Sequence, residues 1–199
     1  MYYVVKYTGV FGFIKPWSAV RDGLTYSQQF LTPSIIEGME KKLFPDMLHK
    51  NGAIEHIARH KLQYCELSEQ NEVAQPRGLT KIKKISKTES LITHGNYKNS
   101  KINFPPITRG VMIYPVLYLA FNSGNDARIA STQHLCLCRN EDIVLPEEQI
   151  LEMSENEFDN LNGFELRFGE SSTSFPVGYS RYDRVMKTGW IEFNGKSLS

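Results

Sequence analysis

The sequence predicts an α+β domain, and three observations predict it. β-branched and aromatic residues gather in short runs bounded by turn residues, which is typical of strands and begins with residues 2 to 10. Residues 33 to 48 instead carry apolar side chains at helical spacing. Residues 76 to 108 are β-prone but contain few large apolar residues, so we expect them to protrude as a hairpin. We expect a single domain over residues 1 to 199, with this hairpin as an insertion within it.

The N-terminal elements are expected to be a strand, a helix and a second strand. Tyr and Val residues dominate the first strand, at residues 2 to 10. Thr32 can cap the helix and Pro33 suits its first position, so the helix is expected over residues 33 to 48. Its apolar stripe comprises Ile35, Ile36, Met39 and Leu43. The second strand, residues 60 to 67, alternates between apolar and polar side chains.

The elements after the hairpin are expected to be two strands, a helix and two further strands. Pro146 with Glu147 and Glu148 predicts the start of the helix, because carboxylates suit a first turn. The two strands are expected at residues 109 to 121 and 127 to 138, with a turn at 122 to 126 between them. The helix is expected at residues 146 to 160. A strand at 163 to 168, a loop at 171 to 184 and a last strand at 185 to 193 follow. This order suits a ferredoxin-like (RNA-recognition-motif-like) domain.

The net charge of +1 hides a strong asymmetry along the chain. Residues 77 to 109 contain eight basic residues and one acidic residue. Residues 141 to 170 contain ten acidic residues and one basic residue. The basic block predicts contact with a polyanion, and the acidic block predicts contact with a basic neighbouring subunit or a solvated helix surface.

Composition indicates an ordinary soluble globular protein, with 41% apolar and 23% charged residues. The N-terminus shows no basic region followed by a long apolar stretch, so we expect no signal peptide. The longest apolar run, residues 111 to 121, is too short to span a bilayer. Three cysteines argue against a disulfide framework. A cytoplasmic protein without membrane contact is the expectation.

The basic hairpin supplies the first candidate binding residues. Lys81, Lys83 and Lys87 would share one face of an extended strand, and Lys84 would lie on the other. Such a row can follow a phosphate backbone while nearby aromatic rings stack on bases. The alternative is a solvated hairpin whose lysines protect an exposed edge strand.

A loop tryptophan supplies the second candidate. Trp17 lies between Lys15 and Arg21, so its ring could stack on a base while the two cations hold phosphates. The alternative is a tryptophan that anchors the start of the following helix. Tyr26 likewise either contacts RNA or packs where the helix begins.

Metal and cofactor sites are not expected. His134, Cys136 and Cys138 alternate along one expected strand, but a Cys-x-Cys spacing without a fourth ligand is more typical of a buried core face. His56 and His60 are four residues apart without the glutamate that a metalloprotease needs. The sequence contains no phosphate-binding loop, dinucleotide fingerprint or serine-hydrolase elbow.

Four segments, in order along residues 2 to 142, carry a resemblance to a known family. Residues 25 to 38 contain Tyr-Ser, then Thr-Pro-Ser, then Gly. Residues 54 to 64, followed by Asn71-Glu72, are similar to the family's second strand. Residues 108 to 121 are similar to the strand after its thumb hairpin, and residues 132 to 141 to its late Cys-Arg-Glu strand. The chain resembles the fifth family of CRISPR-associated (Cas) proteins, within the RAMP superfamily.

This resemblance implies a structural subunit without catalytic residues. Such a subunit binds the 5′ handle of a guide RNA (crRNA), beside target DNA and the backbone and large subunits of a class 1 effector complex that serves antiviral defence. Residues 11 to 17 favour the type IV branch. Lys81, Lys83, Lys84 and Lys87 would hold phosphates, Arg77 and Arg109 would frame the base of the thumb, and Lys15, Trp17, Arg21 and Tyr26 would meet the handle.

Two alternatives remain open from the sequence. Some relatives cleave repeat RNA without a metal, using His, Lys and Tyr, and His94, Tyr97 and Lys98 lie together in the expected thumb. The chain would then be an endoribonuclease. The other alternative is a protein-interaction module whose basic loop meets an acidic partner.

Overall fold

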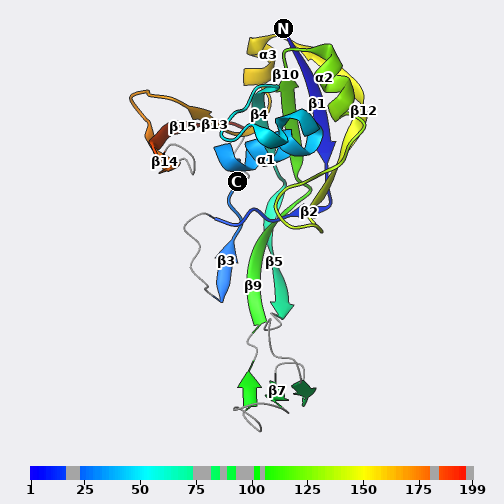
Figure 1. The fold of residues 1–199 in the computed structure, drawn as a ribbon, viewed down its shortest axis with the longest axis vertical. Coiled ribbons are helices and arrows are strands. Elements are labelled where there is room, and N and C mark those ends of the chain that lie inside the picture. Colours follow the sequence, from blue (N-terminus) through cyan, green and yellow to red (C-terminus); the bar gives the residue numbers. More distant parts are fainter. Residues whose placement is uncertain are drawn as a thin grey trace.

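The computed structural model describes residues 1–16, 23–73, 82–85, 89–92, 101–103, 106–179 and 184–195. Within these residues the chain has a mixed α+β fold, mostly antiparallel sheet with few helices (Figure 1). The elements are β1 (Tyr2–Thr8), β2 (Phe11–Gly12), β3 (Leu24–Tyr26), α1 (Pro33–Leu43), the 3-10 helix η1 (Pro45–His49), β4 (Ile57–Gln63), β5 (Glu66–Val73), β6 (Ile82–Lys84), β7 (Glu89–Ile92), β8 (Lys101–Asn103), β9 (Pro106–Ile113), β10 (Val116–Phe121), α2 (Gly124–Ala130), β11 (Leu135–Cys136), β12 (Ile143–Met153), α3 (Glu155–Asp159), β13 (Gly163–Phe168), β14 (Phe175–Tyr179) and β15 (Met186–Asn194).

The largest sheet has the strand order β11-β12-β1-β10-β4-β13-β15-β14. Its central strands β12, β1, β10 and β4 pair antiparallel with their neighbours. α1 connects β1 to the later strand β4, and α2 connects β10 to β12. Each of these helices therefore joins two strands that have one other strand between them in the sheet.

Both faces of this sheet are covered, because apolar residues alternate along its strands. Val5 and Tyr7 of β1 point to the face that α1 and α2 cover, and Val4 points to the opposite face, toward Phe158 of α3. The buried hydroxyl of Tyr7 donates a hydrogen bond of 2.8 Å to the carbonyl of Ala130 at the end of α2. The main core thus lies between the sheet and its first two helices.

The expected helix over residues 33 to 48 ends earlier, because Pro45 disfavours the helical conformation of Phe44. α1 stops at Leu43, and η1 follows. The fully buried Glu40 of α1 accepts hydrogen bonds from the backbone N–H groups that lead into β4. The Glu40 carboxylate therefore joins α1 to the start of β4.

The expectation of a turn at 122 to 126 and a strand at 127 to 138 was wrong. Residues 124 to 130 form α2, and the Ser123 side chain accepts from the N–H groups of Asn125 and Asp126 as its cap. Only Leu135–Cys136 is a strand in the expected range, paired with the start of β12. The segment 132 to 141 is therefore mostly irregular.

The expected helix over 146 to 160 was also wrong. Residues up to Met153 continue strand β12, which pairs with β1 in a register that sets Pro146 opposite Tyr7. Proline is tolerated there because the outer edge of β12 beyond Val144 carries no partner strand among the described residues. The helix signal belongs to the shorter α3, where Ser154 and Glu157 form a capping box. The expected loop at 171 to 184 contains strand β14.

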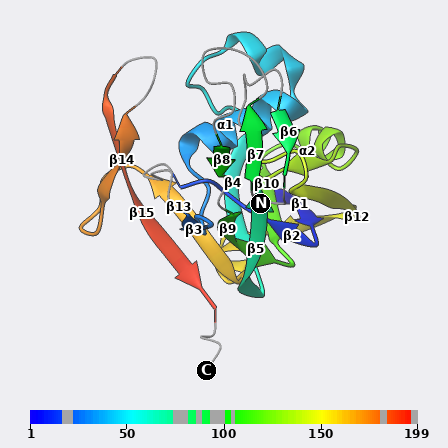
Figure 2. The ribbon, with the colours of Figure 1, turned by 90° about the horizontal axis from the view of Figure 1, so that it is seen from below.

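The segment between β4 and β10 leaves the main sheet. β5 and β9 pair antiparallel over their whole length, from Glu66 opposite Ile113 to Val73 opposite Pro106. Figure 1 shows this β5–β9 ladder leading away from the main sheet, with β7 beyond its far end. β6, β7 and β8 form a separate three-stranded sheet. Figure 2, from below, shows the C-terminal strands β13, β15 and β14 to one side of the β5–β9 ladder, with β14 outermost in the sheet.

Candidate nucleic-acid interface

The strand β9 organises the base of the β5–β9 ladder. β5 lies on one side of β9 and the short strand β3 pairs with it in parallel on the other. Side chains alternate along β9, so that Gly110 lies on one face of this small sheet and Arg109 on the opposite face. The two faces carry different chemistry.

An aromatic ring lies flat on the first face. Tyr26 of β3 is opposite Gly110 in the register, and a Cβ atom placed on Gly110 would lie 2.1 Å from Cδ1 of the tyrosine. Only glycine therefore allows the ring to cross β9 at this point. The Tyr26 hydroxyl donates a long hydrogen bond, 3.4 Å, to Glu69 Oε1. The side chain is still 47% exposed, so the ring offers a face on which a planar ligand can stack.

Two arginines meet on the opposite face. The guanidinium carbon of Arg109 lies 5.4 Å from the ring centre of the buried Phe13, and that of Arg139 lies 5.3 Å from it. Glu72 bridges the two, with Oε1 on Arg139 and Oε2 3.8 Å from Arg109 Nε. Segments 71–72, 108–121 and 132–141, far apart in the sequence, therefore meet here.

The arginines differ in how firmly they are held. Asp142, which is fully buried, accepts from Arg139 at 2.7 Å, and this hydrogen bond raises the pKa of Arg139 above its usual value although burial opposes it. Arg109 is further from its carboxylate and half-buried. Arg139 is thus a structural cation, whereas Arg109 can turn toward a phosphate. Arg139 was not among the binding residues predicted from the sequence. Its place in the Cys-Arg-Glu segment was the only sequence feature that pointed to it.

Five of the predicted binding residues lie in the described part of the chain. Lys15 is exposed, Tyr26 and Arg109 lie at the base of the ladder on its opposite faces, and Lys83 and Lys84 lie in β6, opposite Leu91 and Ser90 of β7. The other predicted residues lie outside the described residues: Trp17, Arg21, Arg77, Lys81 and Lys87, and the nuclease candidates His94, Tyr97 and Lys98.

The expected core face of His134, Cys136 and Cys138 was wrong. His134 and Cys138 are exposed, and the buried residues of this segment are Leu135 and Leu137. Among the described residues, the carboxylates that come close enough to share a cation are Asp159, Glu165 and Glu192. Arginines already fill the space between them, so this cluster does not suit a metal ion.

These carboxylates belong to an ionic network beside β4, in which Arg59 and Glu165 are buried. Arg59 Nε donates to Glu165 at 2.9 Å, and a second ion pair of 2.6 Å joins Arg59 to Asp159. Burial lowers the pKa of Arg59, but these hydrogen bonds raise it overall. Lys61 donates to three carbonyls, those of Phe158, Asp159 and Leu161, and burial lowers its pKa. The cations and carboxylates balance, which indicates a structural role.

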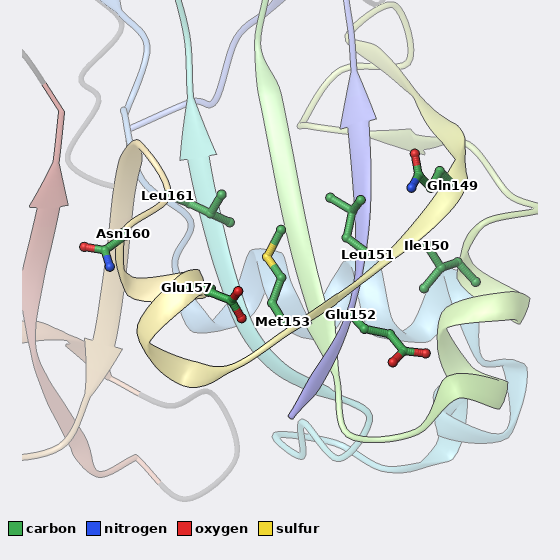
Figure 3. A pocket seen from close by; sticks show the side chains of 8 residues that line it. All are labelled: Gln149, Ile150, Leu151, Glu152, Met153, Glu157, Asn160 and Leu161. Atoms are coloured by element: carbon green, nitrogen blue, oxygen red, sulfur yellow. The ribbon is translucent and has the colours of Figure 1, made fainter.

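A hollow of about 530 Å³ lies between β12 and α3 (Figure 3). Leu151 and Met153 leave β12 on the side of Leu161, whereas Glu152 points away (Figure 3). Glu157 also lines it, but its carboxylate is bound to Ser154 in the capping box. An acidic and apolar lining repels phosphate, so the hollow is not part of a nucleic-acid interface.

No protein-family model matches the chain, and a search of curated proteins found no match. Among the described residues, every helix is too short or too polar to cross a membrane.

Proposed function

We propose that the chain is the guide-RNA-binding subunit of a class 1 CRISPR effector complex of type IV, and that it holds the 5′ handle of the guide. In this proposal the body is a ferredoxin-like domain and residues 76 to 108 are its thumb. The subunit supports RNA-guided binding of target DNA in antiviral or anti-plasmid defence. Its partners are the guide RNA, the target DNA and the backbone and large subunits.

The observation that carries the proposal is the place of the β5–β9 ladder in the chain. The central strands have the order β12-β1-β10-β4, with α1 and α2 each joining strands separated by one neighbour. This connectivity supports the proposal that the body is a ferredoxin-like (split β-α-β) domain. The ladder is inserted between the second and third of these strands in chain order. Arg109 of its strand β9 ends a stretch of the sequence, positions 77 to 109, that contains eight basic residues. A basic hairpin at this point suits a grip on a phosphate backbone.

The base of the ladder adds the groups that single-stranded RNA requires. The exposed ring of Tyr26 offers a stacking surface on one face of the small sheet, Arg109 offers positive charge on the opposite face, and Lys15 is a further exposed cation. Stacking tolerates any base, and cations hold the backbone, so the combination binds RNA without reading a long sequence. Base pairing of the guide then supplies sequence specificity.

Of the described histidines, His49 and His134 are exposed, whereas His56 and His60 give no support to the endoribonuclease alternative. His60 is buried, and burial lowers its pKa to about 4, so it is neutral and out of contact with solvent. His56 is held by Asp126 at 3.0 Å and stacks on Phe44. Neither is placed to take a proton from a ribose hydroxyl.

The test is to express the chain with its genomic neighbours, purify it and sequence the RNA that copurifies. Short RNAs that share one 5′ end, in a complex with further subunits, are the expected result. Preparations of the complex and of the isolated chain that both lack RNA would overturn the proposal. Incubating the isolated chain with repeat RNA tests cleavage separately.

A further inference from the structure

A second hollow, of about 830 Å³, lies where β4, β13 and β15 reach the root of the β5–β9 ladder. Three aromatic rings cross it from strand to strand. Tyr64 and Phe164 are almost parallel, with ring centres 6.1 Å apart and an interplanar angle of 10°. Phe164 and Phe193, opposite each other in the register of β13 and β15, have centres 4.7 Å apart. The row ends at Phe193, which is 56% exposed.

A fourth ring is held on the rim by an unusual backbone. Tyr114 follows β9 and has φ 49°, a left-handed conformation that is strained for a residue other than glycine. Its N–H donates to the carbonyl of Val10 at 2.9 Å, which fixes the turn. The side chain is 63% exposed. The fold therefore keeps a large aromatic side chain at the mouth of this hollow at a cost in backbone strain.

The remaining lining decides the kind of ligand. Among the described residues, the lining includes the carboxamides of Gln63, Asn162 and Asn194 and no charged group; Asn194 also donates to the Asp159 carbonyl at 3.1 Å. A carboxamide both donates and accepts hydrogen bonds, as the edge of a nucleobase does. An uncharged, aromatic lining suits a neutral planar ring and leaves a phosphate outside. The hollow has the properties of a base pocket more than those of a phosphate site.

We propose that this aromatic hollow takes one unpaired base of single-stranded RNA, stacked against Phe193 and Tyr114, with its edge toward the carboxamides. The inference rests on the proposed function and names a second contact for the same RNA. Its position fits, because Cys65 lines the hollow and its N–H donates to Ile113, the last residue of β9. Ile113 lies three residues along β9 from Gly110, on which the Tyr26 ring packs, so the two proposed contacts are close together along this strand.

The test uses the full chain and fluorescein-labelled single-stranded RNA oligonucleotides, with binding measured by anisotropy. Phe193→Ala and Tyr114→Ala are each expected to weaken binding about 5- to 150-fold, the loss of one base stack. Phe168→Ala is the matched control, because Phe168 is 42% exposed on β13 but does not line the hollow. Phe193→Leu, which keeps apolar contact with Phe164, separates lost stacking from lost folding. Thermal unfolding checks each variant.

Ultraviolet cross-linking followed by mass spectrometry locates the base. Cross-links at Tyr114 or Phe193, with weakened binding by the folded variants, support the inference. If the variants keep the wild-type RNA affinity and the cross-links fall only in other parts of the chain, the hollow is not a base-binding site, and the guide-RNA proposal is unaffected. Unchanged RNA affinity with lost binding of a partner subunit overturns it in favour of a protein contact. A wild-type chain and complex without any RNA overturn the proposed function itself.

Discussion

Gly110→Ala is the change that tests the base of the ladder most directly. The added Cβ would lie 2.1, 2.7 and 2.9 Å from three atoms of the Tyr26 ring, so the ring must move. The ring can leave, because a half-exposed side chain with one long hydrogen bond is cheap to rotate. The backbone of Gly110 lies outside the left-handed region, so alanine itself fits the strand. The substitution therefore removes the stacking surface without altering Tyr26 or any charge.

The expected magnitude follows from one lost stack. Base–aromatic stacking contributes about 1–3 kcal/mol, which corresponds to about a 5- to 150-fold loss of RNA affinity. Tyr26→Ala should cause a similar loss. The double variant should lose no more than either single variant, because both changes remove the same contact. The stability of Gly110→Ala should change little, since alanine is favoured over glycine in a strand by about 0.5–1 kcal/mol, which offsets the displaced ring.

The assay is a double-mutant cycle of RNA affinity at fixed salt, with fold checked by circular dichroism. Gly23→Ala is the matched control, because no atom of the described residues lies within 4 Å of its added methyl group. Additive losses in the double variant would show that Gly110 acts independently of Tyr26. Wild-type affinity of the folded Gly110→Ala protein would refute the stacking role of this ring.

Three further outcomes test the thumb, the buried network and a buried histidine. Replacing three hairpin lysines by glutamine should reduce the slope of log affinity against log salt by about 2, measured by salt titration; an unchanged slope removes Lys81, Lys83 and Lys84 from the phosphate contacts. Arg59→Ala leaves the buried Glu165 without its partner and should lower the free energy of unfolding by about 3–5 kcal/mol, measured in urea; a loss under 1 kcal/mol would contradict the network. His60 has a folded pKa of about 4 against an ordinary 6.5, so its contribution to stability is complete above pH 6.5 and is lost as the pH falls toward 4. His60→Leu should flatten the stability profile in that window by up to about 3 kcal/mol, and parallel profiles would contradict this.

Sequence features within a short window were enough to predict elements that depend mainly on their own residues. The Tyr- and Val-rich run at residues 2 to 10 predicted β1, which ends at Thr8, and the Thr32-Pro33 pair predicted the start of α1, although the Thr32 side chain makes no capping hydrogen bond. They failed at Pro146, where a proline followed by carboxylates is also compatible with an outer strand. Pairing with β1 decided that segment, and pairing over 140 residues of sequence cannot be read from a window of ten.

The candidate site was predictable only as composition. Tyr26 and Arg109 were selected as an aromatic and a cation, but their positions on opposite faces of β9 follow from a parallel pairing that no motif announces. Gly110 carried no signal, because its role depends on a ring 84 residues earlier in the chain. Arg139 was passed over because its partners, Glu72 and Phe13, come from two other segments.

The acidic block at residues 141 to 170, which predicted either contact with a basic subunit or a solvated helix surface, instead contributes ion pairs within the domain. Among the described residues, six of its ten carboxylates lie within ion-pair distance of a cation, and those cations are Lys6, Arg59, Arg139 and Arg167. None of these cations belongs to the basic block at 77 to 109. Much of the negative charge is therefore balanced by cations of the body, and Arg109 pairs with Glu72, which lies outside the acidic block. A near-neutral chain can thus keep a basic insertion, which in the proposed function attracts the phosphates of the RNA while the bases meet uncharged aromatic surfaces.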